Sequence, residues 1–168
     1  MVINWKYFSL EQVNRRPGHG QKIWELPEDS PAPGWRAFRA AEAARCQGET
    51  AFTDFHMALL EEKHVRKSDI EDMKVINRVA QRVGLEMARF REDFSRRQSL
   101  ARLAEQHTFA VETLGIFGTP TLVFPAGQAI FLKMSPPPSP EESLAVFREM
   151  SNLACHRPNI LEVKRPPG

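Results

Sequence analysis

The 168-residue sequence has only two cysteines, Cys46 and Cys155, and they form no CxxC pair. Two cysteines so far apart do not make a disulfide framework. The sequence also lacks an apolar run of about 18 residues, which a transmembrane helix needs. An excess of one charge sign is missing too, because 23 basic residues and 21 acidic residues leave a net charge of +2. This balance argues against nucleic acid or a membrane surface as the partner.

Patterns of metal and nucleophile chemistry are equally scarce. The five histidines have no metal-ligand spacing with one another or with the cysteines. His107 falls on an apolar helical stripe, which favours a hydrogen-bonded core histidine over a ligand. No serine has the surroundings of a nucleophile elbow. The sequence therefore predicts no catalytic residue, no metal site and no cofactor.

The N-terminal part predicts a strand followed by a polar connection. A chain of this length buries roughly 70% of its unfolded surface, so one domain with an ordinary core is expected. Val2–Phe8 has the alternation of a strand, with Ile3, Trp5 and Tyr7 on one face. Because Met1 leads directly into this segment rather than into a signal peptide, we expect a cytoplasmic protein. Residues 9–34 are polar, with a short helical turn near 21–26.

A long helical stretch follows. Apolar periodicity and glycine stops predict helices at 35–47, from a Thr50 cap to about Lys63, at 73–83, at 86–94 and at 100–114. Cys46 and Cys155 fall at the carboxyl ends of predicted helices. The negative end of a helix dipole disfavours a thiolate. Each cysteine is therefore predicted to be a small, buried apolar residue rather than a redox centre.

The last third of the chain predicts a hairpin and a final helix. Gly115 has the position of a left-handed residue that ends the preceding helix. Residues 121–124 and 129–133 predict two strands joined by a turn at 125–128. Ser139 followed by Pro140 fits an N-cap and a first helical residue, and the helix is expected to reach about Cys155.

Gly118-Thr119-Pro120-Thr121, followed by an apolar strand, resembles the cis-proline loop of thioredoxin-fold proteins, in particular the DsbA-like thiol-disulfide oxidoreductases. The resemblance covers nearly the whole chain and includes residues 5–14, 38–45 and 162–166. It implies a cis Thr119–Pro120 bond. It also implies that the residue before the proline offers its backbone to an extended substrate. The substrate-binding residues implied by this resemblance are Phe117, Gly118, Thr119, Pro120 and Thr121.

The implied fold class is α/β, an incomplete DsbA-like thioredoxin fold. Residues 1–34 and 115–168 would form the partial thioredoxin-like domain, and residues 35–114 a helical insert. The family fold opens with a strand and a CxxC helix, and this chain has no counterpart of either. The absent strand is central in the family sheet, so its loss exposes backbone donors. The chain is then a truncated form of a longer product, or Val2–Phe8 has shifted into the vacant place, or a second copy completes the sheet. A homodimer is the expected outcome.

Three functions follow from the resemblance. The chain could be a relative of thiol-disulfide oxidoreductases that is inactive here because thiolate chemistry needs the missing CxxC. It could be a non-catalytic binding or assembly module for a peptide or a small thiol. It could be related to the glutathione-dependent isomerases of the same fold, whose serine would lie on the absent segment. Whether the chain is an enzyme stays open at this point.

Overall fold

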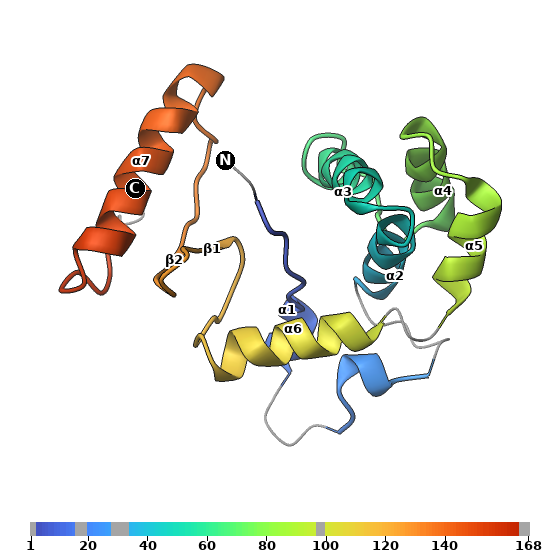
Figure 1. Cartoon of the computed structure of the whole chain (residues 1–168), viewed down its shortest axis with the longest axis horizontal. Helices are drawn as coiled ribbons and strands as arrows, with labels where there is room; N and C mark the ends of the chain where they lie inside the picture. Colours follow the sequence, from blue (N-terminus) through green and yellow to red (C-terminus); the bar gives the residue numbers. More distant parts are fainter. Residues whose placement is uncertain (1–2, 16–19, 28–33, 97–99, 165–168) are drawn as a thin grey trace. The chain divides into compact units, whose positions relative to one another are not determined.

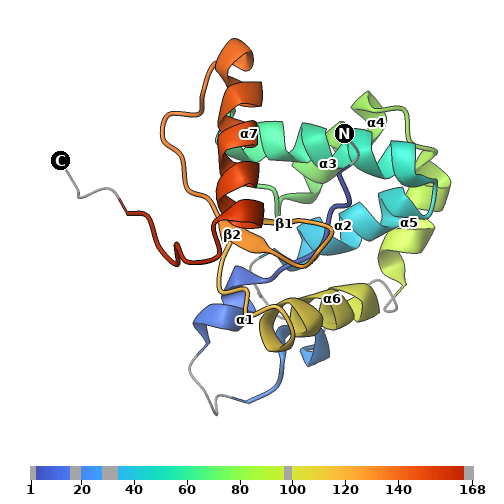
Figure 2. The same cartoon turned by 60° about the vertical axis from the view of Figure 1, so that its left-hand side comes forward.

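The computed structural model of the chain describes residues 3–15, 20–27, 34–96 and 100–164. These residues form two compact units, Met1–Thr108 and Phe109–Gly168. Val2, His19 and residues 165–168, which the sequence analysis used, lie outside the described part. Helices dominate both units, and Figures 1 and 2 show them from two directions. The elements in chain order are α1 (Leu10–Asn14), the 3-10 helix η1 (Ile23–Glu25), α2 (Trp35–Arg45), α3 (Glu49–His64), α4 (Met73–Arg82), α5 (Met87–Ser95), α6 (Ala101–Glu112), β1 (Thr121–Val123), β2 (Ala129–Phe131) and α7 (Pro140–His156).

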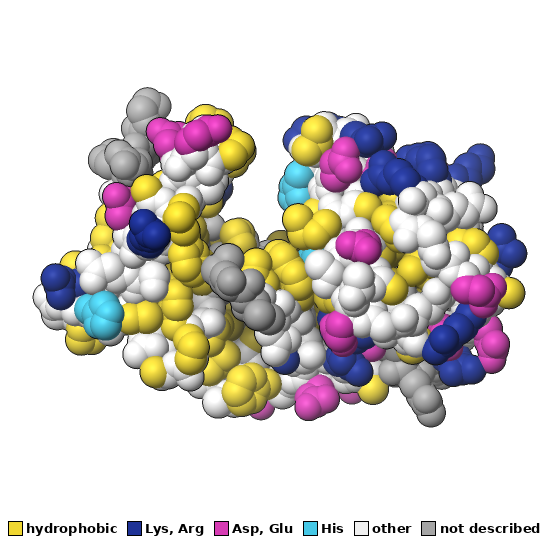
Figure 3. All heavy atoms as spheres, turned by 45° about the horizontal axis from the view of Figure 1, so that its top comes forward, with side chains coloured by type: hydrophobic (Ala, Val, Ile, Leu, Met, Phe, Trp, Pro, Cys, Tyr) yellow, Lys and Arg dark blue, Asp and Glu magenta, His cyan; other side chains and the backbone are white. Residues whose placement is uncertain are grey.

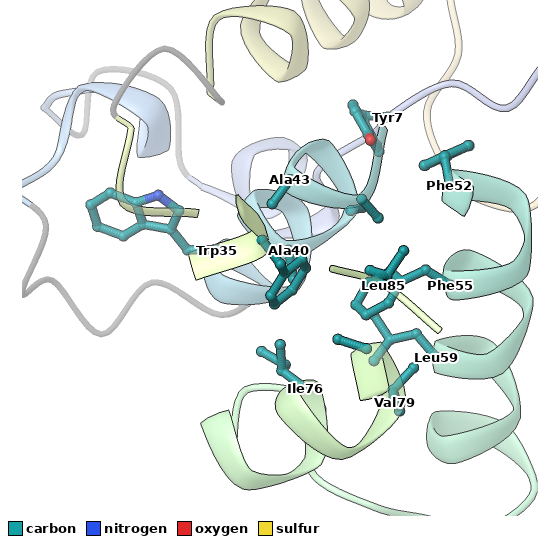
Figure 4. Close-up of a cluster of buried hydrophobic side chains, with 14 of the residues drawn as sticks. Tyr7, Trp35, Ala40, Ala43, Phe52, Phe55, Leu59, Ile76, Val79 and Leu85 are labelled. Atoms are coloured by element: carbon teal, nitrogen blue, oxygen red, sulfur yellow. The ribbon is translucent and has the colours of Figure 1, made fainter. Parts of the chain in front are cut away.

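The core of the N-terminal unit forms where α2 packs against α3, α4 and α5. Helix α2 contributes small side chains, Ala40 and Ala43, which let its neighbours approach closely. Helix α3 contributes Phe55, which is fully buried and lies 5.8 Å from the Phe90 ring of α5, centroid to centroid. Figure 4 shows side chains from these helices pointing toward one another. The predicted helices in this region are therefore confirmed, with apolar stripes that meet in one core.

Acidic side chains begin several of these helices. Asp72 accepts a hydrogen bond from Lys74 N, and Glu86 accepts from two amides in the first turn of α5. Helix α2 has no such neighbour, because its N-cap is Gly34. The carboxylate of Glu71 takes this role instead. It accepts hydrogen bonds from Arg36 N at 3.0 Å and from Ala37 N at 3.2 Å. The start of α2 is thus held by a residue 35 positions away.

The predicted Thr50 cap is wrong. Helix α3 begins at Glu49, and its N-cap is Gly48, whose φ is +120°. Residues other than glycine rarely adopt that backbone conformation, so the helix begins two residues earlier than a Thr50 cap would set it. The predicted polar connection also contains a helix that was not predicted, α1. Its N-cap is Ser9, whose hydroxyl accepts from Gln12 N at 3.1 Å.

The predicted strand Val2–Phe8 is wrong for its described residues. Residues 3–8 run as an extended segment into α1, but they have no strand partner among the residues that the structure describes. Side chains of α6 bind its amides: Tyr7 N donates to Gln106 Oε1 at 2.8 Å, and Ser9 N donates to His107 Nδ1 at 3.1 Å. An extended segment whose amides are satisfied by side chains has no need of a neighbouring strand.

The C-terminal unit contains the hairpin and α7. Strands β1 and β2 are antiparallel, with Leu122 opposite Ile130. Gly115 has the predicted left-handed conformation, at φ +65°, and α6 ends at Glu112, two residues before the predicted end at Leu114. Ser139 forms a capping box with Glu142, and Pro140 is the first residue of α7, also as predicted. One face of the hairpin packs on α7, where the rings of Phe124 and Phe147 are 6.4 Å apart.

Candidate functional site

The five predicted binding residues form the loop between α6 and β1. The side chain of Phe117 is 68% exposed, and Thr119 and Pro120 are exposed as well. The Thr119–Pro120 peptide bond is cis. Thr121 Oγ1 donates a hydrogen bond to the carbonyl oxygen of Gly118 at 2.7 Å and so closes the loop onto the start of β1.

The aromatic ring of Phe131, on β2, supports this loop from one side. A Cβ atom added at Gly118 would lie 3.2 Å from a ring carbon of Phe131, which explains why the buried position 118 is occupied by glycine. The Phe131 ring also lies 5.2 Å from the ring of Phe117, centroid to centroid. The loop therefore rests on the hairpin, while its outer residues face away from it.

Strand β1 has one edge without a partner among the described residues. Pro120 O accepts from Leu132 N, and Phe124 N donates to Gln128 O, so the even-numbered residues of this strand turn their backbone groups toward β2. Backbone groups alternate along a strand. The N–H and C=O groups of Thr121 and Val123 therefore face the opposite edge, where the structure describes no strand beside them. Unpaired edges of this kind are templates for another extended chain.

The outer face of the hairpin, opposite α7, is apolar. Val123 is 46% exposed and Phe131 is 40% exposed, and Phe117 lies beside them. No residue from Thr113 to Leu132 carries a charge. Figure 3 shows apolar side chains gathered on the lobe that carries the hairpin and α7. Charged residues, which commonly protect sheet edges from pairing, are missing here.

The cysteines do not take the buried positions that were predicted for them. Cys46 is exposed and Cys155 is half-buried. Cys46 is the C-cap residue of α2, two positions beyond the buried stretch that ends at Ala44, so it leaves the face that packs in the core. Partial desolvation of the thiol, and then the negative charges of Asp93 and Glu42, raise the pKa of Cys46. A raised pKa opposes formation of the nucleophilic thiolate.

The prediction for His107 is confirmed. Its side chain is 5% exposed, and its Nδ1 atom accepts the hydrogen bond from Ser9 N. Burial, and then the positive charge of Lys22, lower the pKa of this imidazole. Across the described part of the chain, no three His, Cys, Asp or Glu side chains come together as a set that could hold a metal ion.

A buried carboxylate on α3 forms the largest ionic cluster of the N-terminal unit. The side chain of Glu62 is 1% exposed, and its oxygens lie 3.0 Å from Arg78, 3.3 Å from Arg82 and 3.6 Å from Arg66. Ser68 Oγ donates a further hydrogen bond at 2.8 Å. This hydrogen bond, and then Arg78, lower the pKa of Glu62. Arg78 and Arg82 lie on α4, so the cluster joins α3 to α4.

Two residues of the site were missed by the sequence reasoning, Val123 and Phe131. Alternation along residues 121–124 and 129–133 was the available signal, because it places Thr121, Val123 and Phe131 on the same face of the hairpin.

None of the described helices combines the length and the apolar character that crossing a bilayer requires.

Comparison with known proteins gives one family match. The family model described as a DSBA-like thioredoxin domain matches residues 26–145, more than two thirds of the chain. A search of curated proteins finds no match. The helices and the small antiparallel sheet fit the α/β class of this fold.

Proposed function

The chain belongs to the DSBA-like thioredoxin family, and from this premise we propose that it is a binding module that holds an extended peptide without exchanging disulfides. The peptide pairs with the open edge of β1 and lies against the loop Phe117–Thr121. The observation that carries this proposal is the pair of outward-facing backbone positions, Thr121 and Val123, beside an exposed loop in a charge-free stretch.

A strand edge selects a peptide over a small thiol. Ladder hydrogen bonds need donors and acceptors that repeat along an extended chain, and this is how β-strand addition supplies its affinity. Thr121 and Val123 offer such a repeat, with one residue between them. Glutathione lacks this regular spacing, because its first linkage runs through the side-chain carboxyl group of its glutamate rather than through the backbone. The peptide reading is therefore favoured over the glutathione-dependent alternative.

The redox part of the proposal rests on the two cysteines. Thiol-disulfide exchange needs a thiolate of lowered pKa with a resolving cysteine nearby. Cys46 has a raised pKa and caps the carboxyl end of α2, and Cys155 lies in the last turn of α7. Neither belongs to a CxxC. The cytoplasmic address stays a prediction, and free thiols are the usual state of cysteines in that compartment.

The peptide proposal is tested by nuclear magnetic resonance with a defined probe. The probe is a blocked peptide of alternating threonine and valine with a lysine at each end, added to the ¹⁵N-labelled chain. The amide signals of Thr121 and Val123 should shift and become protected from exchange, whereas Leu122, which faces β2, should change little. A copy of the peptide that is N-methylated at every residue should not bind, because neither of its edges then keeps an N–H donor for pairing.

A pair of proline variants sharpens the test. Val123→Pro removes an N–H from the open edge of β1, and proline is tolerated on edge strands. Ala129→Pro removes an outward-facing N–H from β2 and serves as the matched control. The proposal requires Val123→Pro to weaken binding at least about tenfold, the effect of losing a net hydrogen bond near the upper end of the usual range, and Ala129→Pro to leave it unchanged. Equal binding by both variants would overturn it.

A further inference from the structure

We infer that, in the absence of a peptide, the open edge of β1 pairs with β1 of a second copy of this chain. This inference rests on the proposed function, because it names the partner that occupies the same edge. A hairpin of two strands is marginal by itself in water and needs further strands or a packed helix for stability. Helix α7 covers one face of this hairpin but adds no strand to the edge of β1. Only β1 and β2 form a sheet in the described part of the chain.

The edge is self-complementary. When two copies of β1 run antiparallel about a two-fold axis through Leu122, Thr121 of one copy stands opposite Val123 of the other. Both of these residues turn their N–H and C=O groups outward. They therefore form hydrogen-bonded pairs, and every outward backbone group of the strand obtains a partner. A two-fold interface that uses one patch on both subunits is the commonest arrangement in soluble oligomers.

Side chains agree with this register. Thr121 and Val123 would meet as β-branched cross-strand neighbours, a pairing that stabilises sheets. The stretch from Thr113 to Leu132 has no charge, so two copies meet without like-charge repulsion. The exposed rings of Phe117 and Phe131 lie beside the edge on the outer face. An acidic or basic partner would find no complementary charge here, whereas a second copy fits.

Register-specific crosslinking tests the inference. In this register, Leu122 of one copy stands opposite Leu122 of the other as a non-hydrogen-bonded pair. The Cα atoms of such a pair are about 4.5 Å apart, which a disulfide can span. The full chain with Cys46→Ser and Cys155→Ser provides a thiol-free background. Adding Leu122→Cys should give a covalent dimer under mild oxidation. Adding Ile130→Cys instead is the matched control, because Ile130 lies on the same face but on β2, and it should stay monomeric on a non-reducing gel.

Light scattering supplies the equilibrium readout. The wild-type chain should have twice the monomer mass at micromolar concentration, and Val123→Pro should weaken the dimer by about tenfold or more, as for one lost hydrogen bond pair. The threonine-valine peptide should convert the dimer into a complex of one chain and one peptide.

A monomeric wild-type chain that still binds the peptide through Thr121 and Val123 would overturn this inference and leave the proposed function standing. Crosslinking of Ile130→Cys to the same extent as Leu122→Cys would overturn the register. A chain that neither dimerises nor binds the peptide would overturn both.

Discussion

Replacing His107 should destabilise the N-terminal unit by breaking the link between the extended residues 3–9 and α6. Ser9 is 1% exposed, so His107→Ala leaves its N–H buried without the acceptor at 3.1 Å. Such an unsatisfied donor costs about 1–3 kcal/mol. The imidazole also contacts the rings of Phe8 and Trp24, at 4.9 and 5.3 Å, and these contacts are lost as well. His107→Asn keeps an acceptor near the position of Nδ1 and should cost less than the alanine variant.

The assay is urea unfolding followed by tryptophan fluorescence. All three tryptophans, Trp5, Trp24 and Trp35, lie in the N-terminal unit, so the signal reports on that unit. The free energy of unfolding should fall in the order wild type, His107→Asn, His107→Ala. Equal stability of wild type and His107→Ala at pH 8 would refute the assignment of this hydrogen bond.

The same imidazole makes stability depend on pH. Burial, and then Lys22, lower the pKa of His107 below the ordinary 6.5, so the unfolded chain binds the proton more readily than the folded chain does. The stabilisation is complete above pH 6.5 and is lost as the pH falls toward the folded pKa, with a slope of at most about 1.4 kcal/mol per pH unit for one proton. The pKa of His56 is lowered too, by burial and then by Arg45, so part of the slope should persist. His107→Asn should therefore have a smaller slope of the unfolding free energy between pH 7 and pH 5.5 than the wild-type chain. An unchanged slope in His107→Asn would contradict this account.

Two further predictions concern the core and the start of α2. Phe55→Ala should lower the free energy of unfolding by about 3–5 kcal/mol in the same urea assay, because the side chain is fully buried against Phe90. Met57→Ala is the control. Because Met57 is 51% exposed, this variant should change the free energy by no more than about 0.5 kcal/mol. Glu71→Ala should lower the free energy of unfolding by about 1–2 kcal/mol, since it removes the acceptors for Arg36 N and Ala37 N. Glu71→Gln keeps one acceptor oxygen and should restore part of this stability. If Glu71→Ala unfolds at the same urea concentration as the wild-type chain, Glu71 does not cap α2.

Local chemistry explains which helices could be predicted. The left-handed Gly115 after α6 and the start of α7 at Ser139 and Pro140 depend on neighbours in sequence, and both features were predicted correctly. Helix α1 was within reach as well, because Ser9 and Gln12 have the spacing of a capping pair. A structural feature that depends only on contacts within four or five residues can be predicted from the sequence.

Long-range contacts explain what could not be predicted. Alternation in residues 3–8 marks a side that is progressively buried toward Tyr7, but it does not say whether a strand or α6 supplies the amide partners. The capping of α2 by Glu71 is equally invisible in the local sequence. Each of these outcomes depends on packing between segments that are distant in the chain.

The loop at residues 117–121, proposed to bind a peptide, lies between these two cases. It could be proposed because its sequence resembles a cis-proline loop, and the hairpin turn at 125–128 could be predicted from its glycine and proline. The open edge could not, because the side of β1 that faces away from β2 depends on the register, with Leu122 opposite Ile130. The role of Val123 follows only once that register is known.

Binding of the threonine-valine peptide by the double variant Cys46→Ser and Cys155→Ser tests the central claim most directly. The account predicts that the Thr121 and Val123 amide signals shift as in the wild-type chain, with the same dissociation constant, because the backbone edge of β1 does the binding and the thiols do not. Loss of binding in this correctly folded variant would contradict the account, since it would show that recognition depends on cysteine chemistry.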